Sequence, residues 1–120
     1  MKFLVLMAEK DSFARWEAAD AAEHEAAFAR FEAFARAVEE RGSMLGGDAL
    51  ASPDQARTLR PADDAGVRSV VAGPYAETVE QLGGFFLIDV ADLETALEAA
   101  RELPESYSVE VRPIIDMEPG

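Results

Sequence analysis

Two stretches of the chain are apolar at every position, and they predict the central strands of a β-sheet. Residues 3–7 follow Lys2 as Phe-Leu-Val-Leu-Met, and residues 85–88 read Phe-Phe-Leu-Ile. Successive side chains of a strand point to opposite faces, so both faces of these strands must be covered. The chain offers only two substantial helical segments, and we therefore expect helices on one face and a second subunit on the other.

The first helix is predicted to begin at about Trp16 or Asp20 and to end at Arg41, where a glycine follows. Its apolar residues recur at spacings of three and four and indicate a buried stripe of Phe28, Phe31, Phe34 or Ala35, and Val38. A second helix is expected after Asp92, a good N-cap residue, and before Pro104. Its inner side is predicted to consist of Leu93, Ala96, Leu97 and Ala100.

Shorter segments complete the plan. Residues 43–50 predict a strand interrupted by a glycine pair, residues 56–60 and 67–71 predict a hairpin, and residues 107–115 predict the last strand. The order of strand, helix, two or three strands, helix and strand is that of an α+β, ferredoxin-like βαββαβ fold with an extra β-hairpin. At 120 residues the chain fits a single domain, 1–120.

The charge balance narrows the range of partners. The formal net charge is −13. Nucleic acids are bound through basic patches, which this chain lacks, so we expect no nucleic-acid partner. The only concentrated positive charge comes from Arg57, Arg60 and Arg68. An anionic ligand would bind there, with Arg57 as its contact; the alternative is that these arginines are solvated residues at strand edges.

No apolar run approaches the roughly 18 residues that span a bilayer, so no membrane partner is expected. The first apolar run is also shorter than that of a signal peptide and lacks a small-residue cleavage site. The chain has no cysteine, which excludes disulfides and a thiolate nucleophile. These observations favour a cytoplasmic protein.

His24 is the only histidine and thus the only side chain whose ordinary pKa lies near neutrality. It precedes Phe28 by four residues, at the upper end of the predicted buried stripe. It either caps the core or a subunit boundary, or it contacts a ligand and transfers protons. In the second case a carboxylate should orient its other ring nitrogen, and Asp48 is the preferred candidate.

The loop from Gly73 to Thr78 is a second candidate site. Its Gly-Pro pair shapes a turn, from which Tyr75, Glu77 and Thr78 offer a phenol, a carboxylate and a hydroxyl to one pocket; a purely structural loop is the alternative. The chain contains no metal-ligand cluster, Walker motif or nucleophile elbow. We therefore expect no metal and no cofactor.

Residues 72–90, which read AGPYAETVEQLGGFFLIDV, give the most specific signal in the chain. Together with residues 91–98 and the Ser-Val-Glu-Val-Arg-Pro segment at 108–113, they resemble the DGPF-type branch of the YCII-related family. The resemblance implies a ferredoxin-like unit that dimerises through its sheet into a dimeric α+β barrel. It also implies a histidine on the first helix that acts with an aspartate, and a link to sigma factors of the extracytoplasmic-function type.

The chain departs from the family motif Asp-Gly-Pro-Phe at two places, Ala72 and Tyr75. If the motif aspartate is an essential acid or base, Ala72 makes this member inactive or differently active; if it only fastens the loop, the change is tolerated. Two functions follow. The first is a homodimer that binds a small molecule near the first helix and the dimer boundary, with His24 and Asp48 in acid–base chemistry. The second is a non-catalytic metabolite-binding or protein-interaction dimer with a regulatory role.

Overall fold

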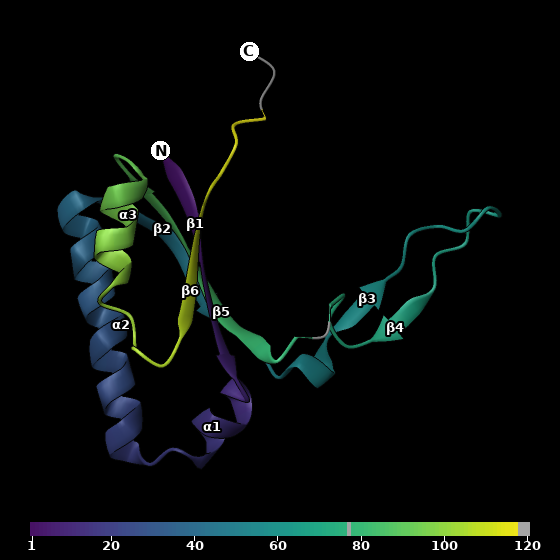
Figure 1. Cartoon of the computed structure of the whole chain (residues 1–120), viewed down its shortest axis with the longest axis horizontal. Helices are drawn as coiled ribbons and strands as arrows, with labels where there is room; N and C mark the ends of the chain where they lie inside the picture. Colours follow the sequence, from purple (N-terminus) through teal and green to yellow (C-terminus); the bar gives the residue numbers. More distant parts are fainter. Residues whose placement is uncertain (77, 118–120) are drawn as a thin grey trace.

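The computed structural model describes residues 1–76 and 78–117. Its main sheet is antiparallel throughout, in the order β2-β5-β1-β6. The helices α2 and α3 lie on one face of this sheet, and α1 lies at its lower end (Figure 1). The described part of the chain is thus a mixed α+β protein in which the sheet stays open, with β2 and β6 as its edges. The elements of this body are β1 (Lys2–Lys10), α1 (Ser12–Ala18), α2 (Ala21–Arg41), β2 (Gly42–Ala49), β5 (Glu80–Val90), α3 (Leu93–Ala100) and β6 (Ser108–Pro113).

The core lies between the sheet and its two long helices. β1 alternates strictly, so that Phe3, Val5 and Met7 are buried beneath the helices while the residues between them are only partly covered. The other strands and helices add further buried apolar side chains: Phe34, Ala37, Val38, Ile88, Val90, Ala96, Ala99, Ala100 and Leu103. Three of the contributions from α3 and the turn after it are alanines, which let this helix approach the sheet closely.

Both main helices begin where the sequence places an N-cap. The backbone N–H of Glu23 donates to Asp20 Oδ1 at 2.8 Å, and that of Thr95 donates to Asp92 Oδ1 at 2.8 Å. The hydroxyl of Thr95 also donates to Asp92 Oδ1 at 2.6 Å. These bonds, first that from the side chain and then that from the backbone, lower the pKa of Asp92 because they stabilise its charged form.

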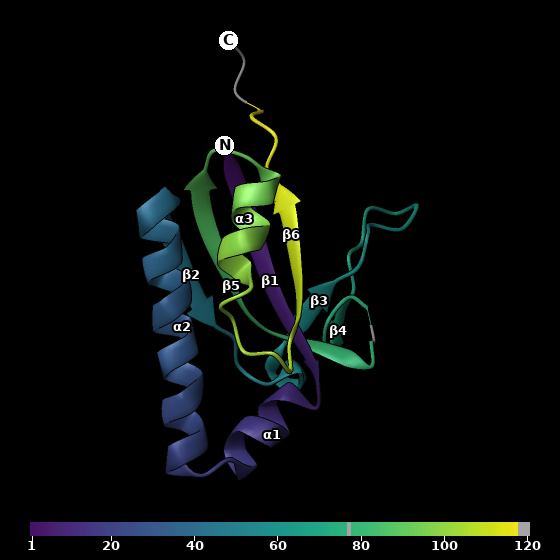
Figure 2. The same ribbon diagram turned by 60° about the vertical axis from the view of Figure 1, so that its left-hand side comes forward.

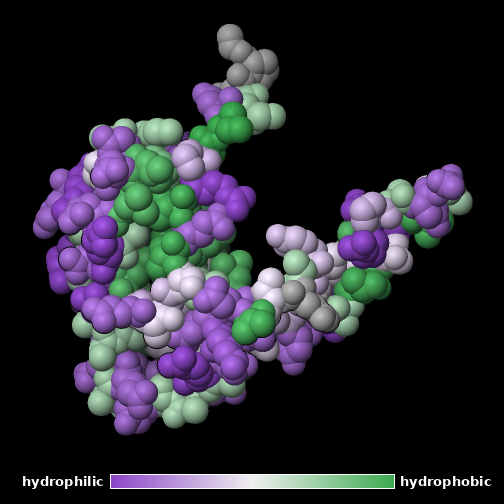
Figure 3. All heavy atoms as spheres, viewed as in Figure 1, coloured by the Kyte–Doolittle hydropathy of each residue, from purple (hydrophilic) through white to green (hydrophobic). Residues whose placement is uncertain are grey.

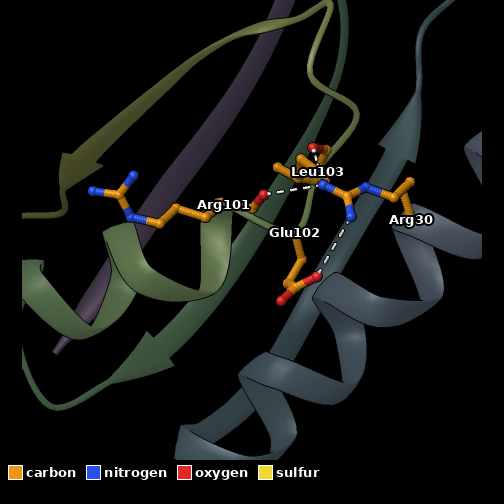
Figure 4. Close-up of polar contacts among 4 residues, drawn as sticks. All are labelled: Arg30, Arg101, Glu102 and Leu103. Carbon is orange, nitrogen blue, oxygen red and sulfur yellow. Dashed lines mark hydrogen bonds and ion pairs between the residues drawn. The ribbon is translucent and has the colours of Figure 1, made fainter.

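The C-terminal end of α3 is tied to α2 by Arg30 (Figure 4). Its Nη2 donates to the carbonyl oxygens of Arg101 at 3.3 Å and Leu103 at 3.5 Å, and its Nη1 lies 3.8 Å from Glu102 Oε2. Arg101 is the C-cap residue of α3 and Leu103 lies in the turn after it, so the guanidinium from α2 satisfies carbonyls that have left the helix. Arg30 therefore fixes the spacing of the two helices that cover the sheet.

Two predictions about the helices need correction. The segment before Asp20 is a separate helix, α1, so the predicted start at Asp20 is confirmed and the alternative start of one long helix at Trp16 is wrong. In addition, Phe28 is 54% exposed and Leu93 and Leu97 are 41% and 42% exposed, although the pattern placed all three inside. α3 rests on its alanine face, which turns its leucines to the flank, and Phe28 lies toward the end of α2 that faces α1 rather than the sheet centre.

The sheet face opposite the helices has no helix over it. Leu4 pairs with Leu87, and Leu6 pairs with Phe85, on this face. These four residues, which we call the open face, are each only partly buried. The apolar sequences of β1 and β5 predicted that both faces of these strands are covered. In the structure only the face toward the helices is fully covered.

The extra hairpin predicted from residues 56–60 and 67–71 is confirmed. β3 (Arg57–Leu59) pairs with β4 (Val70–Ala72), and a short 3₁₀ helix, η1 (Pro53–Gln55), precedes it. The hydroxyl of Thr58 donates to the carbonyl of Gly73 at 2.7 Å and closes the base of the hairpin. We call residues 56–73 the arm, because both ribbon views show it projecting from the body (Figures 1 and 2).

Candidate functional site

A pocket of about 540 Å³ lies at the lower end of the sheet, between α1, the N-terminal half of α2 and the ends of β2 and β5. We call it the aromatic pocket. Its volume is in the range of about 300–1,000 Å³ that is common for small-molecule sites. Most of its wall is apolar. The lining residues are Met7, Ser12, Phe13, Trp16, Phe28, Phe31, Gly47, Asp48, Ala49, Leu50, Ala51, Pro53, Gln81, Leu82, Gly83, Phe86 and Tyr107.

The close approach of α1 to β5 forms one wall of the aromatic pocket. Ser12, at the start of α1, is buried, and a Cβ atom added to Gly83 would lie only 2.7 Å from its Oγ. The Ser12 hydroxyl can rotate, so this contact shows how closely α1 approaches β5 rather than a fixed barrier to a side chain. Gly84, the second glycine of the pair, faces Met7 and the backbone of Asp48 instead.

His24 fastens α1 to α2. Its ring stacks on that of Trp16, with centroids 4.2 Å apart and an interplanar angle of 22°. Its Nε2 lies 2.8 Å from the carbonyl oxygen of Trp16, and since a carbonyl only accepts, Nε2 carries the proton and donates. Trp16 in turn contacts the edge of Phe28 at 5.5 Å. These contacts hold the aromatic wall of the pocket in place.

The structure does not bring His24 and Asp48 together. Asp48 is among the lining residues of the aromatic pocket, whereas His24 stands behind Trp16. Gly47 pairs with Phe86, whose ring packs on the helix side, so Asp48 and its partner Phe85 belong to the other face of the sheet. Among the hydrogen bonds of residues 1–76 and 78–117, none joins the two side chains.

Two of the other predicted ligand contacts lie at a second hollow of about 1,200 Å³ between the base of the arm and the strands β1, β5 and β6. Tyr75 and Thr78 line it, and Tyr75 is 85% exposed. The hydroxyl of Thr78 donates to the carbonyl of Glu80. Arg57 does not line it; its guanidinium donates to the carbonyls of Asp54 and Ala56, at 3.0 and 2.7 Å. Glu77 lies outside the described residues.

Sequence reasoning missed Glu9, a carboxylate of which only 6% is exposed. It continues the helix-facing alternation of β1 and pairs across the sheet with Gln81, which lines the aromatic pocket. Its ion-pair partner is Arg15 of α1, whose Nε lies 3.7 Å from Glu9 Oε1 and whose side chain is 61% exposed. The alternation along β1 could have revealed it. Glu9 continues the every-second-residue series of Phe3, Val5 and Met7 and therefore lies on the same, buried face.

Replacing His24 with alanine is expected to loosen α1 by about 1–2 kcal/mol, because one hydrogen bond and one ring stack are lost. Amide hydrogen exchange should show faster exchange across α1 and the start of α2, with the sheet unaffected. His24→Phe keeps a ring and loses the hydrogen bond, so it should fall between the alanine variant and the wild type. Equal protection of α1 in all three proteins would contradict this role.

The fold and the pocket define a mixed α+β protein with an aromatic-walled pocket at the lower end of its sheet. Within the described residues, none of the helices has the length and apolar character of a membrane span. The family model of the YCII-related domain matches residues 1–118, so the chain belongs to the YCII-related family.

A curated relative is an uncharacterised protein of Rhizobium meliloti (strain 1021), which is 51% identical over 69 residues. That match covers 54% of this chain and 54% of the relative, so the chain spans about half the length of the relative that it matches.

Proposed function

We propose that this protein binds a small molecule with an apolar body in the aromatic pocket. The observation that supports the proposal is the enclosure of about 540 Å³ by mostly apolar side chains, with α1 held over it by His24 and Trp16. The hydrogen bond and the ring stack of His24 hold α1 against α2 from its outer side. His24 is then a positioning residue, and the pocket is the site.

Binding without catalysis fits the contacts better than acid–base chemistry. A general base needs an available nitrogen near the substrate and a carboxylate that orients the ring. With Nε2 donating to the Trp16 carbonyl, Nδ1 is the basic nitrogen, but His24 does not line the pocket and Asp48 belongs to the other face of the sheet. Proton transfer by this pair is therefore the second candidate, and it needs turnover that substitution of either residue abolishes.

A thermal-shift screen of apolar metabolites should yield a ligand that raises the melting temperature and changes the emission of Trp16. Phe28→Ala removes an exposed ring from the pocket wall and should weaken that ligand by about tenfold, while the fold is retained. Leu97→Ala, at an exposed position on α3, is the matched control and should bind as the wild type does. A screen without hits, or hits that Phe28→Ala leaves unchanged, would contradict the proposal.

We further propose a ferredoxin-like unit of the DGPF-type branch that forms a homodimer through the open face, giving a dimeric α+β barrel. The strand order β2-β5-β1-β6 supports it, as does the apolar open face formed by Leu4, Leu6, Phe85 and Leu87. An apolar sheet face without a helix needs a partner to exclude water.

The space-filling view also shows apolar residues along the arm (Figure 3). The alternative is a protein-interaction role. The exposed apolar side chains of Leu59, Val67, Val70 and Val71 on the arm support it.

Leu6→Lys is expected to convert the dimer into a monomer. An unpaired ammonium buried in an apolar interface costs several kcal/mol, so dimerisation should weaken by at least about a hundredfold. Size-exclusion chromatography with light scattering at micromolar concentration measures this directly. Leu97→Lys introduces the same charge on the helix side and should remain dimeric. A wild-type protein that is monomeric under these conditions would refute the dimer.

A further inference from the structure

We propose that the aromatic pocket selects amphiphiles with an amine or ammonium head and rejects those with a carboxylate or phosphate head. The inference rests on the proposed binding function and goes beyond it by naming the class of ligand. It follows from three features of the site: the rings in its wall, the charges around it and the net charge of the chain.

The wall favours a cation over an anion at short range. Among the described lining residues none is lysine, arginine or histidine, while five phenylalanine and tryptophan rings contribute from the three elements α1, α2 and β5. Aromatic faces attract ammonium groups through their quadrupole and offer nothing to an anion. A carboxylate or phosphate that entered this pocket would lose its water without meeting a positive partner, which is costly. The rings are Phe13, Trp16, Phe28, Phe31 and Phe86.

The charges near the pocket act in the same direction. Asp48 is the one acidic residue among its lining residues within the described chain, and its side chain belongs to the opposite face of the sheet, so its charge acts on the pocket only from across β2. Glu9 is buried one strand away, opposite Gln81, and its partner Arg15 is 3.7 Å distant and 61% exposed, so the solvated guanidinium offsets the buried carboxylate only in part. His24, the remaining basic group close by, is stacked behind Trp16 and does not line the pocket.

The whole chain strengthens this preference at long range. A formal charge of −13 produces a negative potential that raises the local concentration of cations and lowers that of anions. The concentrated arginines that sequence reasoning assigned to an anion are on the arm, and Arg57 is held by the carbonyls of Asp54 and Ala56. They are not part of the aromatic pocket.

The only tryptophan of the chain, Trp16, lines the pocket, so its fluorescence reports occupancy. We would titrate the wild-type protein at neutral pH with decylamine, 1-decanol and decanoate, each below its micelle concentration. The three share one apolar tail and differ only in the head. The expected order of affinity is amine, alcohol, carboxylate, with the amine at least about tenfold tighter than the carboxylate.

Three variants separate the head from the tail. Glu9→Gln should reduce the advantage of the amine by a few-fold and leave 1-decanol unchanged. Asp48→Asn removes a charge on the opposite face of the sheet and should change the preference less; the comparison of the three compounds on the wild type keeps the test valid if Glu9→Gln does not fold. Ala51→Phe fills the pocket and should abolish the response to all three compounds. High salt should shrink the difference between amine and carboxylate.

The outcomes are distinguishable. If none of the three compounds changes Trp16 emission, the proposed function fails together with the inference. If decanoate binds as tightly as decylamine or tighter, the binding function stands and the selection by charge is overturned. A response to decylamine that persists in Ala51→Phe would mean adsorption to the acidic surface, and would also overturn the inference.

Discussion

Replacing Phe34 with alanine is expected to lower the free energy of unfolding by about 3–5 kcal/mol, the range measured when a buried phenylalanine is truncated. Phe34 is fully buried at the centre of α2, and its ring packs on Phe86 of β5 with centroids 4.8 Å apart. A helix on one side and a sheet on the other leave little room for collapse, so the cavity should persist. The total free energy of unfolding of a domain of this size is only about 5–15 kcal/mol.

Urea denaturation followed by circular dichroism measures this loss. Phe28→Ala, on the same helix, is the matched control because its ring is 54% exposed, and it should cost less than about 1 kcal/mol. The two variants also separate stability from binding, since only Phe28 lines the aromatic pocket. Equal destabilisation by the two substitutions would show that the core is not where the structure places it.

Gly42→Ala is expected to destabilise the protein by about 1–3 kcal/mol, as overpacked substitutions do. A Cβ atom at this position would lie 2.0 Å from the backbone carbonyl oxygen of Asp89 and 3.1 Å from Cγ1 of Val90. The first contact is with backbone, which cannot rotate away, so β2 must separate from β5 at the point where α2 leads into the sheet. Because Gly42 also ends α2, the end of this helix should be strained as well.

Gly46→Ala is the control in the same strand, because a Cβ atom there meets nothing within 4 Å. It should leave stability within about 0.5 kcal/mol of the wild type. Thermal and urea unfolding of the two variants in parallel give the comparison. A loss for Gly46→Ala as large as that for Gly42→Ala would place the cause in the glycine backbone rather than in the contact with β5.

The sequence determined the elements of this protein wherever one local pattern was sufficient. Continuous apolar runs marked β1 and β5 because a central strand needs both faces apolar. Asp92 marked a helix start because a carboxylate accepts the free N–H groups of a first turn. For the first long helix the sequence left Trp16 and Asp20 as alternative starts, and the structure has Asp20 as the N-cap. The hairpin at residues 56–72 was found from its turn residues, and the resemblance of residues 72–113 to the YCII-related family agrees with the family assignment.

Only the tertiary structure decided the site, because its residues meet across long stretches of chain. Trp16, Phe86 and Tyr107 belong to different elements, and no local pattern tells that their rings share one pocket. The pairing register of β2 with β5 places the side chain of Asp48 on the face of the sheet away from His24. This register includes a shift between Met44 and Gly46, which the sequence does not reveal. The hydrogen-bond partner of His24 is likewise a tertiary feature: it is the carbonyl of Trp16, eight residues earlier, which His24 can reach because α1 and α2 are separate helices.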